Sequence, residues 1–175
     1  MKKSIWMAMI ALATTFFVAC DDDDDVQPTP TLDQYDINFL NRATRANRST
    51  IALNQLAADS FTNPGVQQYA QEMIANSQNA QKTLDSIATI YSLQLPSTGD
   101  TAVSAFRNSL MAMGRGRNFD TSFVGYQIRL HDYYLIDLND AAANAKDAGV
   151  KNYATGRVPI ITTFRNRADS LFGSL

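Results

Sequence analysis

Apolar and small residues recur along most of this chain at spacings of three and four positions, with polar residues between them. This spacing places the apolar side chains on one face of an α-helix, so it predicts amphipathic helices. The first predicted face comprises Leu32, Tyr35, Phe39, Ala43, Ala46, Thr50, Leu53 and Ala57. The second face comprises Val66, Ala70, Met73, Ser77, Ala80, Leu84, Ile87 and Tyr91.

The ends of these two helices carry boundary signals. Thr31 or Asp33 is suited to cap the first helix, because a side-chain oxygen there can accept from the free amides of the first turn. In "FTNPG", Asn63 is the expected cap of the second helix and Pro64 its first residue. The stretch "LPSTGD" is expected to end the second helix.

A long connection and two further helices are predicted beyond that stretch. Within residues 96–118, one short helix is predicted from Val103, Phe106, Leu110 and Met113. A third long helix, from Asn118 to Gly149, has the face Phe119, Phe123, Gln127, Leu130, Tyr134, Leu138, Ala141 and Ala145. The fourth has the face Val150, Tyr153, Arg157, Ile161, Phe164, Ala168 and Leu171. Pro159 lies inside this last helix and should kink it, because proline removes a main-chain hydrogen bond.

The order of these elements predicts an all-α fold. Short turns within the first and last helix pairs, with a long crossover between the pairs, are typical of a ferritin-like up-down four-helix bundle. The predicted bundle domain spans residues 32–175 and is large enough to bury a core of its own. Stacked tetratricopeptide repeats are the competing all-helical fold, but the predicted helices are too long and too unequal for them.

Residues 1–19 have the features of a secretory signal peptide. Lys2 and Lys3 supply the positive start, an apolar stretch follows, and Ala19 is a small residue before the expected cleavage point. The apolar stretch is shorter than the roughly 20 residues that a membrane-spanning helix needs. The mature chain is therefore expected to begin at Cys20.

The sequence "FVAC" around Cys20 resembles the lipobox of bacterial lipoproteins, in which this cysteine is lipid-modified. The alternative is an ordinary signal peptide that leaves a free thiol, which secreted proteins usually avoid. The resemblance implies an outer membrane lipoprotein, facing the periplasm or the cell surface, with the membrane as a partner through its lipid anchor.

The residues after Cys20 form an acidic and proline-containing segment that extends to residue 31. Its aspartates are Asp21, Asp22, Asp23, Asp24 and Asp25. This run resembles the surface-export signal of lipoproteins in the Bacteroidetes. The alternative is a plain tether, because like charges stay solvated and prolines stiffen the chain.

Composition narrows the possible partners. The chain has 175 residues, 45% of them hydrophobic, and a formal net charge of -2. Without the two N-terminal lysines and the aspartate run, the domain is close to neutral. It therefore lacks the concentrated basic face of a nucleic-acid-binding protein, and nucleic acid is not an expected partner.

Several segments between Asp36 and Leu171 carry a family resemblance. They are "DINFL", "ALNQLA", "VQQYAQEMI", "FDTSF", "QIRLH" and "VPIITTF". In order and spacing they resemble successive blocks of a bacterial envelope family, the domain of unknown function 4142. The resemblance implies a ferritin-like fold over nearly the whole mature domain.

Members of that family commonly carry inward-facing metal ligands. The pattern is a Glu in the first helix, an Asp-His pair in the second, and a His in each of the third and fourth. Carried over by position, these places are Thr50, then Asn76 with Ser77, then His131, and Phe164. Only His131 matches, so Thr50, Ser77, His131 and Phe164 are interpreted as degenerate ligand positions.

The residue types support this interpretation independently. A ferritin-type di-iron site takes carboxylates from all four helices and two histidines, whereas this chain has one histidine, His131, and one glutamate, Glu72. Its helical aspartates flank the apolar faces and are expected to face water. They are Asp36, Asp59, Asp85, Asp137, Asp140, Asp147 and Asp169. No metal or other cofactor is therefore expected.

His131 is expected to lie in a small polar cluster with Thr50, Ser77 and Gln127, large enough to hold a water. The alternative makes it a remnant ligand or a general base. Without a nucleophile, an orienting acid or a metal, a lone histidine supports little chemistry. The sequence thus predicts a binding or structural module and not an enzyme, whose partner is an envelope protein or a small ligand. The alternative function is a metal-binding protein or oxidoreductase with non-standard ligands.

Overall fold

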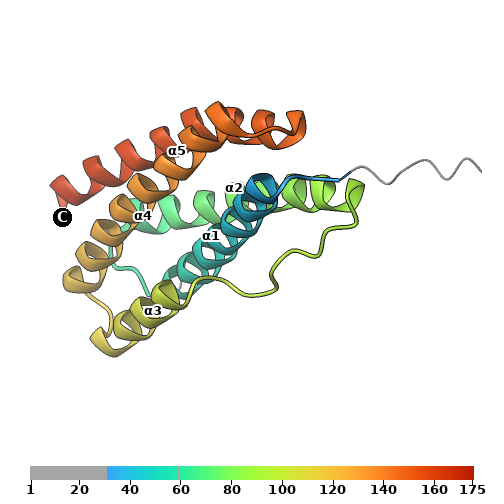
Figure 1. The fold of residues 1–175 in the computed structure, drawn as a ribbon. Helices are drawn as coiled ribbons and strands as arrows, with labels where there is room; N and C mark the ends of the chain where they lie inside the picture. Colours follow the sequence, from blue (N-terminus) through green and yellow to red (C-terminus); the bar gives the residue numbers. More distant parts are fainter. Residues whose placement is uncertain (1–30, 59) are drawn as a thin grey trace, which may run out of the picture.

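The computed structural model describes residues 31–58 and 60–175, and in these residues it contains helices and no strands. The helices are α1 (Gln34–Ala58), α2 (Pro64–Ile90), α3 (Thr101–Met113), α4 (Arg117–Asn144) and α5 (Ala148–Ser174) (Figure 1). The signal peptide, Cys20, the aspartates 21–25 and Asp59 lie outside the described residues. The predicted all-α fold, with four long helices and a short helix in the crossover, is confirmed.

The four long helices form an antiparallel bundle. The first turn of α1 contacts the turn between α4 and α5, and the first turn of α4 contacts the turn between α1 and α2. Neighbouring helices therefore run in opposite directions, while α2 and α4 run the same way. The connection between α2 and α4 must consequently travel the length of the bundle, which explains the long crossover. This is the topology of ferritin-like bundles.

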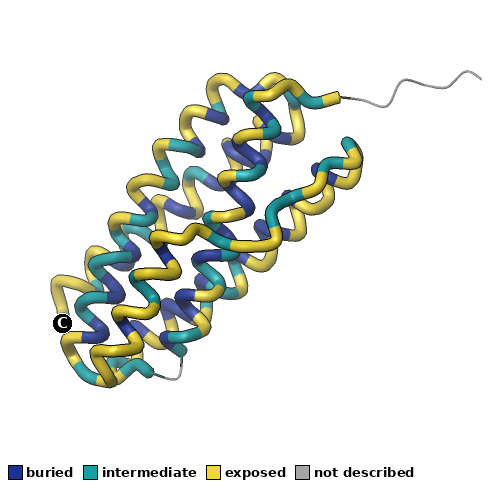
Figure 2. Tube along the Cα trace, turned by 60° about the horizontal axis from the view of Figure 1, so that its bottom comes forward, coloured by how far each residue is buried: buried dark blue, intermediate teal, exposed yellow. Residues whose placement is uncertain are grey.

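The core consists of two apolar clusters, one toward each end of the bundle. One cluster contains Phe39, Leu84 and Leu138, and the other contains Tyr69 and Phe123. Figure 2 shows the buried positions turned inward along each long helix. Between the clusters, α1, α4 and α5 bury polar residues at Asn47, Gln127, His131 and Arg157. A polar layer thus separates the two halves of the core.

Two of the predicted helix starts are confirmed at the level of individual atoms. Asn63 Oδ1 accepts from Gly65 N at 2.8 Å and from Val66 N at 3.3 Å, and Pro64 is the first residue of α2. At the start of α1, Asp33 Oδ1 accepts from Asp36 N at 2.8 Å. Asp33 therefore caps α1, as one of the two residues predicted to do so.

The predicted boundary between the last two helices is wrong by several residues. The sequence pattern placed it at Gly149, whereas α4 ends at Asn144 and α5 already begins at Ala148. Asp147 caps α5 by accepting from Val150 N at 2.9 Å. α5 continues through Pro159 to Ser174.

Asp36 corrects a second expectation, because it is buried and does not face water. Only 1% of its surface is exposed, and its carboxylate accepts from Asp147 N at 2.7 Å and from Lys146 N at 3.2 Å. Asp120 has the same role at the opposite end of the bundle. It is 1% exposed and accepts from Asn63 N at 2.9 Å and from Thr62 Oγ1 at 2.6 Å.

The α1–α2 and α4–α5 hairpins share one residue pattern. In the first hairpin Asp36 comes before the helix cap Asn63, and in the second Asp120 comes before the helix cap Asp147. The number of residues between aspartate and cap is the same in both hairpins. Under the same shift in numbering, further identical pairs are Phe39 and Phe123, Gly65 and Gly149, Val66 and Val150, Tyr69 and Tyr153, and Ala70 and Ala154. The bundle is therefore built from two similar hairpins, each of which fixes the turn of the other.

The crossover is attached to α1 at Ser49, just before α3 begins. Asp100 N donates to Ser49 Oγ at 2.6 Å, and the Asp100 side chain caps α3 by accepting from Ala102 N. A Cβ on Gly99 would lie 2.5 Å from Ser49 Oγ and 3.0 Å from Ser49 N. Only glycine therefore allows the crossover to approach α1 this closely.

Gly99→Ala is expected to lower the free energy of unfolding by about 1–3 kcal/mol, because the added methyl group pushes the crossover away from α1. Denaturant unfolding measures the loss, and faster amide exchange in α3 locates it. Gly156→Ala is the matched control, since nothing lies within 4 Å of its Cβ and it sits inside α5. That change should raise stability by about 0.5–1 kcal/mol. Equal effects at both sites would contradict the packing argument.

Candidate functional site

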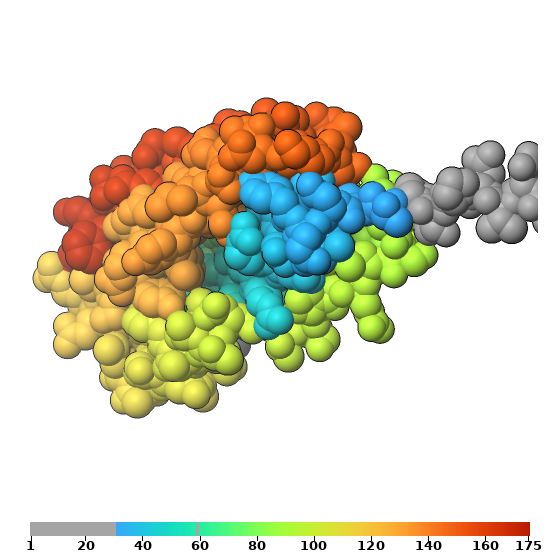
Figure 3. Space-filling model, viewed as in Figure 1, coloured from blue at the N-terminus to red at the C-terminus, as the bar shows by residue number. Residues whose placement is uncertain are grey.

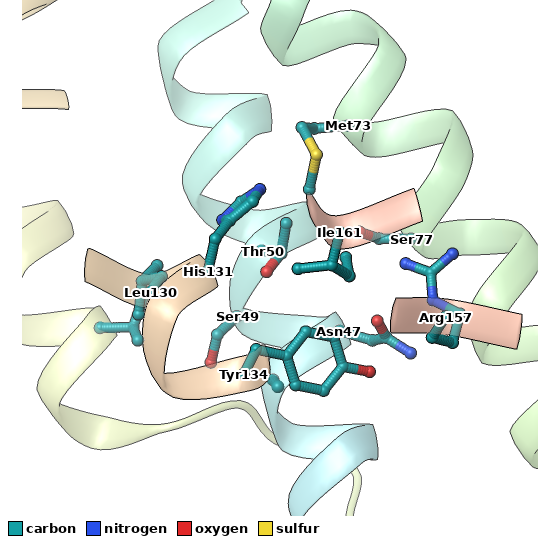
Figure 4. Close-up of a pocket in the computed structure, with 12 residues that line it drawn as sticks. Asn47, Ser49, Thr50, Met73, Ser77, Leu130, His131, Tyr134, Arg157 and Ile161 are labelled. Atoms are coloured by element: carbon teal, nitrogen blue, oxygen red, sulfur yellow. The ribbon is translucent and has the colours of Figure 1, made fainter. Parts of the chain in front are cut away.

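The polar layer of the bundle encloses a small pocket (Figure 4). Its volume is about 40 Å³. Because a buried water needs roughly 10–15 Å³, this space suits about three waters or a ligand of similar size. The lining residues come from all five helices and are Ala46, Asn47, Ser49, Thr50, Met73, Ser77, Val103, Leu130, His131, Tyr134, Arg157 and Ile161.

The pocket lies where the two hairpins meet. Most of its lining residues form pairs of equivalent positions in the two hairpins. The members of each pair are related by the same shift in residue number that relates Asp36 to Asp120. The pairs are Ala46 and Leu130, Asn47 and His131, Thr50 and Tyr134, Met73 and Arg157, and Ser77 and Ile161. Equivalent positions thus face the same space from opposite sides, and the two hairpins fill them with different chemistry.

The structure brings three of the four degenerate ligand positions together. Thr50, Ser77 and His131 line the pocket. Phe164 lies in the adjacent apolar cluster, where it packs edge-on against Tyr69 with 5.8 Å between ring centroids. Gln127, expected in the same polar cluster, is fully buried one turn from His131, but it does not line the pocket.

His131 is held as a neutral imidazole. Its Nε2 lies 3.1 Å from the Oη of Tyr69, which can donate to it. Burial lowers the pKa of His131 to about 4, and the positive charges of Arg157 and Arg165 act in the same direction, while Asp132 opposes them. At neutral pH the ring is therefore uncharged, and its Nε2 can accept the hydrogen bond of Tyr69.

Two tyrosines extend the polar layer beyond His131. Tyr134 Oη and Tyr153 Oη are 3.0 Å apart, and Asn47 Nδ2 donates to Tyr153 Oη at 3.2 Å. Burial raises the pKa of both phenols, so both stay protonated. Asn47 and Tyr134 line the pocket, and Tyr153 connects them in one uncharged chain.

Arg157 is the charged residue of the pocket, and sequence reasoning placed it only on the apolar face of the last helix. It is 6% exposed, and its Nε and Nη2 have no hydrogen-bond partner in the part of the chain that the structure describes. The ion pairs among these residues involve Arg42, Arg165 and Arg167 but not Arg157. A charged residue on an apolar helical face is the signal that could have identified it.

A larger pocket of about 240 Å³ adjoins the small one and opens to the surface. Both are lined by Ala46, Val103, Leu130 and Tyr134. Figure 3 shows the corresponding hollow between α1, α4 and the crossover. The outer pocket therefore borders the polar layer on its solvent side.

The donor set of the small pocket does not fit a ferritin-type metal site. His131 is its only imidazole, and no carboxylate lines it. Across residues 31–58 and 60–175, no group of three or more His, Cys, Asp or Glu lies close enough together to hold a metal ion. Catalytic zinc would need three protein ligands, and the nearby Arg157 would repel a cation.

These features define an all-α bundle of ferritin-like topology. A family model described as a domain of unknown function (DUF4142) matches residues 22–171, and the chain belongs to this family. The fold is similar to the crystal structure of a DUF305 fragment from Deinococcus radiodurans, with a TM-score of 0.75 and 11% sequence identity over 83% of this chain and 100% of that chain. No curated protein matches the chain. Over the described ranges, no helix combines the length and apolarity needed to cross a bilayer.

Proposed function

We propose that the chain is a lipid-anchored protein of the bacterial envelope whose bundle binds a small ligand and performs no catalysis. The observation that carries the binding role is the pocket between the hairpins, in which polar side chains from several helices converge on one small space. The outer pocket adjoins it and opens to the surface. The ligand is a small molecule or ion, in keeping with the volume of about 40 Å³.

The chemistry of the pocket favours binding over catalysis. His131 is neutral, its side-chain hydrogen-bond partner is a phenol, and no carboxylate lines the pocket to orient it. A general base acts when a nucleophile or substrate proton lies within hydrogen-bond reach and its pKa lies near the working pH. The pKa of His131, near 4, is poorly matched to that task.

The proposal of a lipid anchor is based on the lipobox-like segment at Cys20, which lies before the described residues. Cys20→Ser is expected to move the protein from the membrane fraction to the soluble fraction, because the thiol that would receive the acyl chains is missing. Cell fractionation and partition into detergent measure this change. Replacing Asp21–Asp25 by asparagine is the control for the anchor, since it should leave membrane attachment intact. Retention of the Cys20→Ser protein in the membrane would refute lipid anchoring.

The alternative function is metal binding or oxidoreduction with non-standard ligands. Its specific support is that His131 occupies one of the positions where family members carry a ligand. Elemental analysis of the full-length protein, produced with iron, manganese or zinc in the medium, separates the two functions. Near-stoichiometric metal that disappears in His131→Ala would replace our proposal by this alternative.

A further inference from the structure

The polar layer contains one fixed positive charge without a counter-charge. Arg157 is 6% exposed, and arginine stays protonated in proteins, so it cannot lose its charge to suit the interior. A buried charge is strongly unfavourable unless it is paired and hydrogen-bonded. Two other arginines of α5, Arg165 and Arg167, form ion pairs with Asp132 and Glu72 respectively.

The groups that surround Arg157 carry no negative charge. Asn47 and Ser77 are uncharged, His131 is a neutral imidazole, and Tyr134 and Tyr153 are protonated phenols. The two buried carboxylates of the described chain, Asp36 and Asp120, are committed to the turns at opposite ends of the bundle. Residues 31–58 and 60–175 therefore supply no acid to this arginine.

The same surroundings are rich in hydrogen-bond donors. Two guanidinium nitrogens of Arg157, Nε and Nη2, have no partner among the described residues. The hydroxyls of Ser77 and Thr50 also belong to the lining. In Figure 4 the Arg157 side chain lies beside Ser77 and Asn47 at the edge of the pocket. Hydroxyl donors that line a small space beside a fixed positive charge are suited to an anion.

We infer that the pocket beside Arg157 is a binding site for a small monovalent anion, a carboxylate such as formate or acetate or an inorganic ion of similar size. The pocket volume of about 40 Å³ limits the occupant to about four non-hydrogen atoms. The guanidinium of Arg157 supplies the positive charge, and Ser77 and Thr50 supply hydroxyls to the pocket lining. The inference rests on the proposed binding function and names its ligand class.

The single histidine of the chain provides a direct readout. Burial is the main cause of the lowered pKa of His131, and the charge of Arg157 lowers it further, so an anion that neutralises Arg157 should raise that pKa above its starting value of about 4. The experiment titrates full-length protein in mild detergent with sodium formate, acetate or chloride and follows the His131 ring by NMR. Sodium gluconate, whose anion is too large for the pocket, keeps the ionic strength constant. A saturable rise in the His131 pKa is the expected result.

Two comparisons make the outcome specific. Formamide and acetamide match formate and acetate in size but are uncharged, so they should bind far more weakly to the wild-type protein. Arg157→Met should weaken formate binding by roughly 30-fold or more. Arg165→Met removes a partly buried charge that is paired with Asp132, so it should change the starting pKa of His131 but leave formate binding unchanged. The comparison of acid with amide uses wild-type protein and remains decisive even if Arg157→Met does not fold.

The possible results separate this inference from the broader function. If the amides bind as well as the acids, or if Arg157→Met binds formate normally, the anion site is wrong and the pocket remains a site for small neutral ligands. If neither acids nor amides perturb His131, both the anion site and the proposed ligand pocket are wrong. Tight, charge-dependent binding that only Arg157→Met abolishes supports the inference.

Discussion

Asp36→Ala and Asp120→Ala are each expected to lower the free energy of unfolding by about 2–4 kcal/mol. Each carboxylate is 1% exposed and accepts from two main-chain amides in a turn of the opposite hairpin, Lys146 and Asp147 for Asp36, Thr62 and Asn63 for Asp120. Truncation leaves these amides without their acceptor, and a buried group left unpaired costs about 1–3 kcal/mol. Urea unfolding of the single variants measures the loss.

Asp85→Ala is the control for these variants, because Asp85 is exposed and its side chain accepts only from Gln81 Nε2 on the same helix. It should change stability by less than about 0.5 kcal/mol. The losses from Asp36→Ala and Asp120→Ala should add in the double variant, since the two sites lie at opposite ends of the bundle. Their sum approaches the whole stability of a typical domain, about 5–15 kcal/mol. A double variant that stays as stable as either single variant would contradict this account.

These two aspartates also explain how the pocket keeps its shape. Each one connects its own hairpin to the turn of the other, so the hairpins are held together at both ends. The pocket lies between these attachments and takes residues from both hairpins, such as Ser77 from the first and Arg157 from the second. Polar packing at the centre of the bundle is therefore tolerated because the ends fix the relative position of the hairpins.

The helices were predictable because their signals are local. Apolar spacing over several turns defines α1, α2 and α4, and the Asn63–Pro64 pair marks the start of α2 through contacts within a few residues. The fold class followed from helix lengths and from the one long crossover. Helix propensity, capping and periodicity all depend on residues that are close together in the sequence.

The errors came from contacts between distant residues. The end of α4 depends on Asp36, whose carboxylate holds Lys146 N and Asp147 N outside the helix. Local spacing gave no sign of this, because Asp36 flanks the apolar face of α1 and resembles an exposed residue. The burial of Asp120 has the same origin. A carboxylate that satisfies turn amides in another hairpin cannot be told from a solvated one by its neighbours in sequence.

The sequence predicted part of the pocket lining. Thr50, Ser77 and His131 line the pocket together because their helical faces converge, whereas Phe164 lies in the adjacent apolar cluster, where it packs against Tyr69. The spacing places Arg157 on an apolar face, but periodicity alone does not distinguish a buried guanidinium from one that extends its long side chain to solvent. Its missing partners become apparent only when all the surrounding helices are in place.

A second large effect is expected in acid, where protonation of His131 should destabilise the fold. Burial lowers the pKa of His131 to about 4 in the folded protein, from 6.5 for an unperturbed histidine. Between these values the unfolded chain binds the proton more strongly, so stability falls as the pH drops from 6.5 to 4. The shift corresponds to about 3 kcal/mol. Urea unfolding at successive pH values, with gluconate as the only added anion, measures this loss.

His131→Gln isolates this contribution, because glutamine does not titrate and its amide oxygen can still accept from Tyr69. The wild-type protein should be the more stable of the two at pH 7 and should lose that advantage progressively down to pH 4. Carboxylates titrate in both proteins and cancel in the difference. NMR of the single histidine gives its pKa directly. A pKa near 6.5, or a stability difference that does not change with pH, would mean that water reaches His131 freely. The polar layer would then be an open, hydrated space, and the burial of Arg157 would lose its basis as well.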